Sequence, residues 1–547
     1  MSWDHAAAVA RFDAAERADI AARRDQTVLV RYWDKYLQEV GEENAYSKLE
    51  FSYPRNKAGG LTMSVPRKDI VQAHYDHLFN NPDGADATIP ITVNTKAFRW
   101  DGYITRAAVM EDEHGVQTVE IEAIHCWQHI ATTALWASPF APILAQFPRH
   151  DVKFGGVRTL FLLYMVTNLM RLQSGFWFSG SGWLDAPDWA EVGSALWPIT
   201  VVPIDVWRDG SPFRAASARF DMADELLVPL CEGTGVSFHA KFFIPGEDEQ
   251  PAPDWYTLSI PTVVLWTEDK SGITGPTGTL IDGIILELEE WVDDTTPVRY
   301  PNYLAQTEYE TVYATNGPLG TVRTHPWVCY LQGEYSGLAT SELAVHKPLA
   351  TRVIVGGRSP GWVNAAIEIA AKNLLAWLGL LIGLPGLDSL YQGQLDDVFL
   401  AWMYYEDAGR IQRAGPFAFR EHVATNSAKA FNLEGVVTGL RALDKTKGYV
   451  SKRATLGDSG PYQIGVDYSI GDQLIFQVGD GQLFSDYVTE MIFRDDRDKG
   501  AAWELVIGDG SEEEDSVVQG WGRIGAITGA LKTLFTDVGA DLDLIIF

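Results

Sequence analysis

Residues 91 to 138 read ITVNTKAFRWDGYITRAAVMEDEHGVQTVEIEAIHCWQHIATTALWAS. Apolar and polar residues alternate before and after a charged segment, EDEHG, at residues 111–115. This pattern is typical of an antiparallel hairpin with one buried face and one solvated face. The stretch contains no catalytic motif, so it predicts a β-meander with a structural role.

The strand pattern extends through the amino-terminal quarter of the chain. Strands are expected at 26–33, 47–53, 60–65, 89–94, 97–110 and 116–127. These short strands are numerous enough for a small barrel or a curled sheet, so residues 26–138 are assigned to a first β-barrel domain. Residues 1–25 have a helix-favouring composition and are expected to form a helical arm.

The middle of the chain has a mixed pattern. The run at 157–173 is apolar nearly all round and predicts a buried helix, and a second helix is expected at 216–233. Strands are expected at 255–267 and 279–291, on either side of the glycine-rich KSGITGPTG. These elements indicate an inserted α/β domain over residues 139–344.

The carboxyl-terminal part combines helical and strand patterns. The expected elements are helices at 395–412 and 416–431 and strands at 462–478, 484–495 and 501–508. The expected fold class is therefore α+β, β-dominated and multidomain. Its divisions are a helical arm at 1–25, a first β-barrel domain at 26–138, an inserted α/β domain at 139–344, a second β-barrel domain from 345–356 and 450–510, a helical lobe at 357–449, and a linker with a helical tail at 511–547.

The charge balance and the cysteine spacing exclude several classes of protein. With 73 acidic and 43 basic residues the formal net charge is −30, whereas binding nucleic acid by neutralising phosphates needs clustered Lys and Arg. Cys126, Cys231 and Cys329 are far apart and lack CxxC spacing, so neither a disulfide framework nor a zinc ribbon is indicated. The 19 Trp residues indicate large packed interfaces or a bulky core.

No segment carries the pattern of a catalytic or cofactor site. His125, Cys126 and His129 form one close cluster of metal-ligand side chains and His74 with His77 another, but a metal site needs three or four convergent ligands. A GxSxG motif is missing, and GGRSPG lacks the Lys-Ser/Thr ending of a phosphate loop. We therefore expect no enzyme, no cofactor and no metal, with the histidines and cysteines in structural roles.

Two apolar segments stand out instead. The uncharged run LLAWLGLLIGLPGL at 374–387 is shorter than the roughly 20 residues needed to cross a bilayer, and the chain ends in the apolar DLDLIIF. For 374–387, packing in the core or against another subunit is the first interpretation, and a buried plug or a membrane-touching tip at the tail end is the alternative. The apolar end of the chain is expected to dock on a partner or on a sister subunit. The candidate contact residues are Leu374, Trp377, Leu378, Leu381, Ile382, Leu384, Trp521, Leu531, Leu534, Phe535, Ile545, Ile546 and Phe547.

Several stretches also carry a family resemblance. They are VLVRYWDKYLQEVGEENAYSKLEFSYPRNKAGGLTMSVP (28–66), the RWDGYI and CWQHIATTALWASP elements, TGPTGTLIDGIILELEEW (274–291), VIVGGRSPGWVNAAIEIAAKNLL (353–375) and YQIGVDYSIGDQLIFQV (462–478). Together they resemble the minor tail proteins of siphophages that infect actinobacteria. Those proteins are similar in turn to the tail-associated baseplate hub of other long-tailed phages.

The resemblance implies a fold and a structural function. It implies that both β-barrel domains are of the hub type and that the protein forms a homotrimer at the distal tip of a non-contractile tail. The implied partners are the distal tail protein, the tape measure protein and tail fibre or receptor-binding proteins, with transient contact to the host envelope. DNA would pass through without specific binding, past acidic walls.

The location and one alternative function complete these expectations. The amino terminus lacks the basic and apolar pattern of a signal peptide, so assembly in a bacterial cytoplasm is expected. The resemblance implies location in the virion, at the distal tail tip. The alternative function is a tail protein that binds or cleaves cell-wall glycans, with Trp and acidic residues lining a groove.

Overall fold

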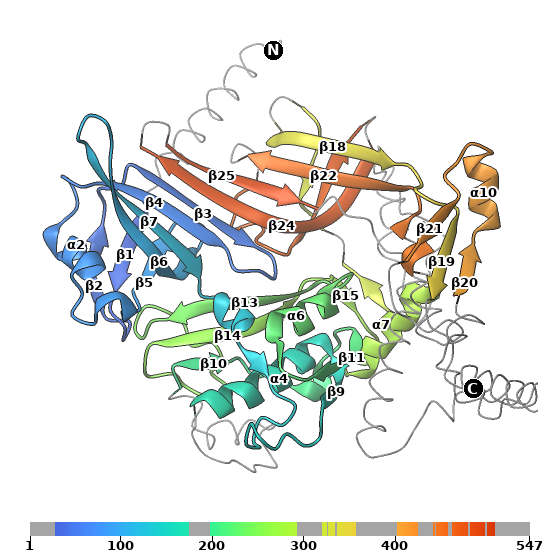
Figure 1. Ribbon diagram of the computed structural model, residues 1–547, viewed down its shortest axis with the longest axis horizontal. Helices are drawn as coiled ribbons and strands as arrows, with labels where there is room; N and C mark the ends of the chain where they lie inside the picture. Colours follow the sequence, from blue (N-terminus) through green and yellow to red (C-terminus); the bar gives the residue numbers. More distant parts are fainter. Residues whose placement is uncertain are drawn as a thin grey trace, which may run out of the picture.

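One large, mainly antiparallel sheet dominates the computed structural model (Figure 1). The structure describes residues 28–173, 197–292, 320–324, 326–333, 336–356, 402–424, 441–443, 445–457, 462–479, 482–497 and 500–508. Over this part the protein is α+β and β-dominated, as the sequence predicts. The large sheet contains 13 strands, and smaller sheets and helices cover its lower side in Figure 1.

The amino-terminal half of the sheet confirms the predicted strands. Its strands are β1 (Leu29–Trp33), β2 (Glu39–Glu43), β3 (Lys48–Pro54), β4 (Gly60–Pro66), β5 (Pro90–Asn94), β6 (Arg99–Glu111) and β7 (Gln117–His125). The β6–β7 hairpin pairs in register from Glu111↔Gln117 to Arg106↔Glu122, and the register shifts by a bulge between Arg106 and Ile104. Buried and partly exposed residues alternate along β7, as the pattern of the opening stretch predicts. β2, the helix α2 (Gln72–Phe79) and the 3-10 turn η1 (Gly84–Asp86) were not predicted.

The carboxyl-terminal half continues the same sheet. Its strands are β17 (Cys329–Tyr330), β18 (Leu338–His346), β22 (Tyr449–Gly457), β23 (Gln473–Val478), β24 (Gln482–Asp496) and β25 (Gly500–Ile507). β24 has 15 residues, and its second half pairs with β25 on one side and with β3 on the other, from Glu490↔Pro54 to Asp496↔Lys48. The β24–β3 ladder therefore joins the two regions that the sequence assigned to separate barrels.

The expected closed barrels need correction. Strand pairing in the described part of the chain follows an open path, β18-β22-β25-β24-β3-β4-β7-β6-β5-β1-β2, and does not return on itself. The physical reason is the length of β24, which is sufficient to bond β23 with its first half and both β25 and β3 with its second half. Alternation along single strands cannot distinguish a closed barrel from one curled sheet.

One hydrophobic core lies under both halves of the sheet. Phe51 of β3 stacks on Phe493 of β24 with ring centroids 5.1 Å apart, and Trp503 of β25 meets Phe51 edge-on at 5.7 Å. Trp100 of β6 packs 6.0 Å from the same ring. We call Phe51, Trp100, Phe493 and Trp503 the aromatic seam, because these rings fill the space where the two halves meet.

A middle lobe packs against the sheet through a second core. Its elements are α3 (Gln128–Ala131), β8 (Ala134–Leu135), β9 (Asp151–Gly156), α4 (Val157–Gln173), β10 (Ile199–Val201), η3 (Val206–Arg208), β11 (Phe213–Ala218), β12 (Asp221–Met222), α6 (Ala223–Leu227), η4 (Val228–Cys231), β13 (Val236–Phe243), β14 (Thr262–Asp269), β15 (Ile273–Thr274), α7 (Ile281–Val292) and β16 (Val322–Arg323). α4 confirms the predicted buried helix with the same bounds.

Two predictions for this lobe are wrong in detail. The expected helix at 216–233 is instead the end of β11, the short β12, α6 and a 3-10 turn, because Phe220 adopts a positive φ of 66° and breaks the segment. The expected strand at 279–291 is the helix α7. Its apolar residues Ile281, Ile284, Ile285 and Leu288 follow a helical period that the run of apolar residues obscured.

A small sheet forms a further lobe. β19 (Arg352–Gly356) pairs antiparallel with β20 (Trp402–Glu406) and parallel with β21 (Glu421–Val423), and α10 (Ala408–Ala414) follows β20. Of the helix expected at 395–412, residues 402–406 form β20 and only residues from 408 are helical, whereas residues 395–401 lie outside the described part. Of the helix expected at 416–431, residues 421–423 form β21 and residues 425–431 lie outside the described part. The sequence grouped 345–356 with the carboxyl-terminal strands, whereas β18 makes that connection by pairing with β22. Among the described helices, none is both long and apolar enough to cross a membrane.

Candidate functional site

The contact residues predicted from the two apolar segments lie outside the described residues. They fall within 374–384 and 521–547, and the structure describes neither segment. Both surfaces stay predictions. The described part offers other candidates, which are the predicted histidine clusters, the polar contacts between lobes and one pocket.

His125 and Cys126 are packed in the interior. His125 meets Trp100 edge-on at 5.3 Å, and its Nδ1 accepts a hydrogen bond of 3.1 Å from the backbone N–H of Trp127. Burial lowers the pKa of His125 to about 3 and raises the pKa of the Cys126 thiol well above its ordinary value. A neutral imidazole and an un-ionised thiol have a packing role, because nucleophilic chemistry needs a thiolate.

The other histidines of the clusters have separate partners. His129 on α3 lies 2.9 Å from the hydroxyl of Tyr103 through its Nε2. His74 Nδ1 lies 3.1 Å from a buried carboxylate oxygen of Glu43, and His77 bonds a backbone carbonyl. Within the described ranges no group of three or more His, Cys, Asp or Glu side chains could hold a metal ion.

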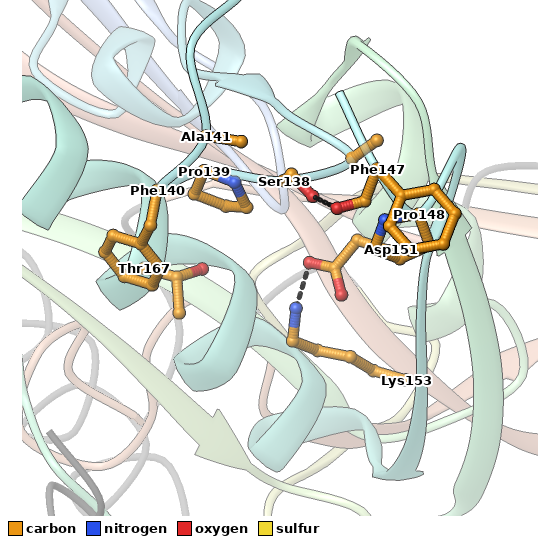
Figure 2. Close-up of a pocket in the computed structure, with 10 residues that line it drawn as sticks. Ser138, Pro139, Phe140, Ala141, Phe147, Pro148, Asp151, Lys153 and Thr167 are labelled. Carbon is orange, nitrogen blue, oxygen red and sulfur yellow. Dashed lines mark hydrogen bonds and ion pairs between the residues drawn. The ribbon is translucent and has the colours of Figure 1, made fainter. Parts of the chain in front are cut away.

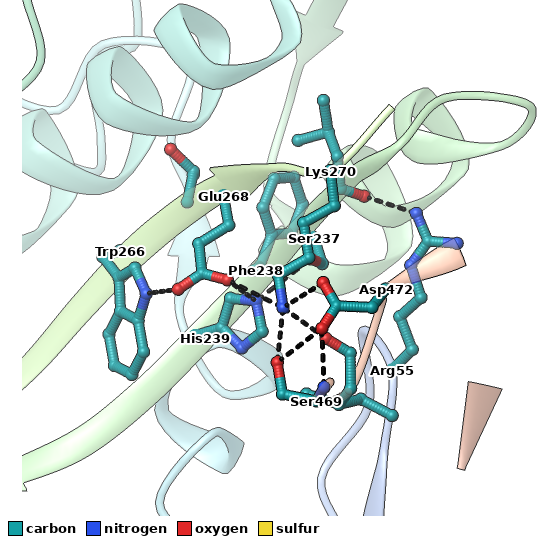
Figure 3. Close-up of polar contacts among 12 residues, drawn as sticks. Arg55, Ser237, Phe238, His239, Trp266, Glu268, Lys270, Ser469 and Asp472 are labelled. Atoms are coloured by element: carbon teal, nitrogen blue, oxygen red, sulfur yellow. Dashed lines mark hydrogen bonds and ion pairs between the residues drawn. The ribbon is translucent and has the colours of Figure 1, made fainter. Parts of the chain in front are cut away.

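An extended polar contact joins the middle lobe to both halves of the large sheet (Figure 3). Its residues come from the β3–β4 turn, from β13, from β14 and the turn directly after it, and from the loop before β23. We call it the polar junction, and its members are Arg55, Ser237, His239, Trp266, Glu268, Lys270, Ser469 and Asp472.

Lys270 lies at the centre of the polar junction. Its Nζ donates to the Ser469 hydroxyl at 2.6 Å and to the carbonyl of Ile470 at 2.9 Å. It also forms ion pairs with Asp472 at 3.1 Å and with Glu268 at 3.3 Å. The side chain of Lys270 is 17% exposed, so these interactions are only partly screened by solvent.

His239 and Glu268 form the part of the junction that belongs to the middle lobe. His239 stacks on Trp266, its Nε2 lies 3.0 Å from the Ser237 hydroxyl, and burial lowers its pKa to about 4. Burial would favour the neutral acid at Glu268, but the contacts of this carboxylate with His239, Trp266 and Lys270 outweigh it and lower its pKa. Glu268 is therefore a stable anionic partner for Lys270.

Arg55 and Asn56 fix the β3–β4 turn against β13. Arg55 Nη2 donates to the carbonyls of Thr234 and Val236 at 2.9 and 3.1 Å, and its guanidinium lies over the Tyr487 ring of β24 at 4.6 Å. Asn56 adopts a positive φ of 53°, and its Oδ1 accepts a hydrogen bond from a backbone N–H of β13. The turn thus connects the sheet to the edge of the middle lobe.

A second polar contact ties the middle lobe to β1 and β6. Arg31 holds Glu247 with two hydrogen bonds of 2.8 Å, and Arg99 bridges Asp101 and Asp248 at 2.7 and 2.9 Å. Burial raises the pKa of Asp101 to about 6. We call these five residues the arginine clamp. Its acidic residues 247 and 248 belong to the segment PGEDEQPAPD, which sequence patterns identify only as a turn.

The chemistry of both contacts is structural. Their donors and acceptors bond one another. The Ser237 hydroxyl lies within hydrogen-bond reach of His239 Nε2, but both side chains are buried, and the Glu268 carboxylate approaches that same nitrogen rather than Nδ1. Such networks fix the relative orientation of the parts that they join. Sequence reasoning missed them because their members lie far apart in the chain, as Arg55 does from Asp472, and no local pattern marks them.

The pocket in Figure 2 lies beside the loop that connects β8 to β9. Its volume is about 570 Å³, and Phe140, Phe147 and Pro148 form apolar walls. Asp151 and Lys153 form an ion pair at the pocket (Figure 2), and burial raises the pKa of the carboxyl and lowers the pKa of the amine. An apolar pocket with a few polar groups is a common form of binding site.

Comparison with known families gives one match over most of the chain. A family model described as "Siphovirus ReqiPepy6 Gp37-like protein" matches residues 29–509. The chain belongs to this family. Membership in the Gp37-like family confirms the resemblance to siphophage tail proteins that the sequence motifs indicated, and the match extends over both halves of the large sheet and the middle lobe.

Two relatives of the Gp37-like chain are minor tail proteins of mycobacteriophages. Minor tail protein Gp28 of Mycobacterium phage L5 is 22% identical over 548 residues, covering 89% of this chain and 91% of that protein. Minor tail protein Gp28 of Mycobacterium phage D29 is 22% identical over 523 residues, covering 84% and 87%. The similarity therefore spans nearly the full length of both relatives.

Solved structures show a more distant likeness. A tail protein from Neisseria meningitidis MC58 has a TM-score of 0.36 and 10% identity, covering 90% of this chain and 98% of that one. The 43 kDa tail protein of prophage MuSo2 from Shewanella oneidensis has a TM-score of 0.37 and 9% identity, covering 88% and 97%. Prophage tail protein gp18 from Listeria monocytogenes EGD-e has a TM-score of 0.34 and 8% identity, covering 92% and 99%.

Proposed function

We propose that this protein is a structural subunit of the tail tip of a long non-contractile phage tail. The observation that carries the proposal is the near full-length similarity to two minor tail proteins within a siphovirus family. The described architecture supports it, because the polar junction and the arginine clamp fix three parts of the chain into one scaffold. The role needs no chemical step.

In this proposal the two halves of the large sheet correspond to the two hub-type domains expected from the sequence. Copies of the chain assemble as a homotrimer that closes the tail tube and contacts the distal tail protein, the tape measure protein and fibre or receptor-binding proteins. The formal net charge of −30 supports passage of DNA, because acidic surfaces repel phosphates.

Immunogold labelling of intact virions tests the proposal. Antibodies against the purified protein should label only the distal end of the tail, and a phage carrying a nonsense mutation in this gene should assemble no complete tails. Label along the tube or on the head, or normal tails without the protein, would refute the proposed function. Antibodies against the major tube protein control for access to the tail.

A further inference from the structure

The tip of the β6–β7 hairpin presents apolar and acidic side chains together. Met110, near the end of β6, and Val116, directly before β7, are 53% and 57% exposed. Glu111 and Glu113 beside them are exposed as well. In Figure 1 the hairpin extends beyond the neighbouring strands of the sheet. The hairpin tip, residues 109–117, is therefore a projecting surface with apolar and negative character.

The hairpin tip has a fixed shape. The Asp112 carboxylate accepts hydrogen bonds from the backbone N–H groups of His114 and Val116 at 2.9 and 2.8 Å. Gly115 supplies the positive φ of 77° that closes the turn. A surface that is ordered before binding loses little conformational entropy on binding, so this turn is suited to docking.

The loop at 139–150, between β8 and β9, exposes several large apolar side chains. Leu144 is 96% exposed, Phe147 is 77% exposed, and Ile143 lies in the same turn. Gln146 braces this turn, because its amide donates to two loop carbonyls at 3.1 Å and accepts from the backbone N–H of Ser138 at 2.8 Å. Exposed apolar residues on a braced loop are typical of an interaction surface.

Basic residues flank this loop. Arg149 and Arg219 are exposed, and the β9–β11 ladder, which pairs Asp151 with Ala218, brings both arginines to one edge. Neither guanidinium has an ion-pair partner in the part of the chain that the structure describes. In a protein of formal net charge −30, two such arginines beside an apolar loop favour an acidic and apolar partner. We call the loop, the pocket of Figure 2 and these two arginines the basic socket.

The hairpin tip and the basic socket cannot meet within one copy. In Figure 1 the hairpin projects at the upper left, whereas the segment that leads into β9 lies at the bottom, across the middle lobe. Their surfaces are complementary, since one is apolar and acidic and the other apolar and basic. A contact between two different surfaces of identical copies is head-to-tail, and it closes a ring when the rotation between copies allows.

We propose that the hairpin tip of one copy docks in the basic socket of a second copy. Met110 and Val116 pack against the apolar loop and pocket, and the carboxylates of Glu111 and Glu113 pair with the arginines at its edge. The inference rests on the proposed function, since it identifies the surfaces through which copies of the tail-tip subunit meet.

Site-specific cross-linking of the full chain tests this contact. Val116→Cys and Leu144→Cys are made separately in a Cys329→Ser background, because Cys126 and Cys231 are buried. A bis-maleimide should link position 116 to position 144 in a mixture of the two variants, as read by peptide mass spectrometry, and should give no covalent dimer with either variant alone. The background protein is the control for linking through the remaining cysteines.

Any cross-linking result other than the 116–144 link contradicts the docking proposal. An oligomer by native mass spectrometry without the 116–144 link would refute this interface and leave the proposed function standing. Links of 116 to 116 or of 144 to 144 would show a two-fold contact instead. If the purified protein formed no oligomer and virions contained no copy of the protein, the contact and the proposed function would both be refuted.

Charge reversal provides a second, quantitative measurement. Glu113→Arg should weaken association of the copies about tenfold, because it places like charges together. Adding Arg149→Glu should restore most of the affinity, since the pair is then reversed. Glu42→Arg, at an exposed acidic residue of β2 away from the tip, is the matched control and should change nothing. Equal weakening by Glu113→Arg and Glu42→Arg would contradict the proposal.

Discussion

Lys270 shows at the scale of one residue how the lobes of this protein are held together. It bonds the loop before β23 through Ser469 and Ile470, and it pairs with Asp472 and Glu268. A substitution would leave both carboxylates without their cation in a partly buried place, which costs more than the loss of a surface ion pair.

Replacing Lys270 with Met should lower the free energy of unfolding by about 2 kcal/mol, because it removes these contacts at once. Chemical denaturation followed by fluorescence measures the change. Lys96→Met, at an exposed lysine, is the control and should stay within about 0.5 kcal/mol of the unsubstituted protein. If the two variants were equally stable, the polar junction would not hold the lobes together.

The buried His125 predicts a dependence of stability on pH. Its pKa is lowered to about 3 in the folded protein by burial, whereas the unfolded chain titrates near its ordinary value of about 6.5. Between these values only the unfolded chain binds the proton, so stability falls as the pH is lowered through this window. The full effect is on the order of 5 kcal/mol.

A variant isolates this effect from that of other groups. Asp101, whose pKa is raised to about 6, has the opposite effect on stability: between its ordinary pKa and pH 6 it stabilises the folded protein as the pH falls. The contribution of His125 is therefore measured as the difference between the unsubstituted protein and a His125 variant. His125→Asn keeps an acceptor for the Trp127 N–H, and its free energy of unfolding should fall less steeply between pH 6.5 and 4. An unchanged slope would show that His125 is protonated in the folded state.

β24 shows at the scale of one element what sequence patterns predict and what they miss. Its alternation predicts a strand correctly at 484–495, and the apolar run at 157–173 predicts α4, because both patterns are local. Pairing of β24 with β3 depends on contacts between residues more than 400 positions apart, such as Phe493 and Phe51. No local pattern encodes that pairing, so the predicted barrels were drawn as separate units.

The aromatic seam makes the β24–β3 pairing testable. Phe493 is fully buried against Phe51 and Trp503, so Phe493→Ala should lower the free energy of unfolding by about 3 to 5 kcal/mol. Phe417→Ala, at a fully exposed phenylalanine, should have little effect. Urea denaturation with a single transition would show that both halves of the sheet lose structure together. Two separate transitions would mean that the halves fold independently.

In the candidate sites, too, sequence patterns predict local features and miss contacts between residues that are distant in the chain. The sequence predicted structural roles for His125 and Cys126, and burial with the shifted pKa of each group supports that interpretation. The polar junction and the arginine clamp were not predicted, because their residues are ordinary charged side chains until the fold brings them together. The contact residues predicted at 374–384 and 521–547 stay predictions, since they lie outside the described residues.

At the scale of the whole molecule, the fold presents a scaffold with distinct surfaces at different ends. The large sheet, the middle lobe and the small β19 sheet are described parts of one chain, and the hairpin tip and the basic socket face different directions (Figure 1). A ring of copies joined head to tail would use both surfaces once per copy. The formal net charge of −30 is compatible with the proposed passage of DNA.

The most direct test of the central claim is a cryo-electron microscopy reconstruction of the distal tail tip of the virion. The account predicts that this chain forms a closed homotrimeric ring there, with the β6–β7 hairpin of each copy against the loop at 139–150 of the next. A reconstruction in which the tail tip contains no copy of this fold would contradict the account.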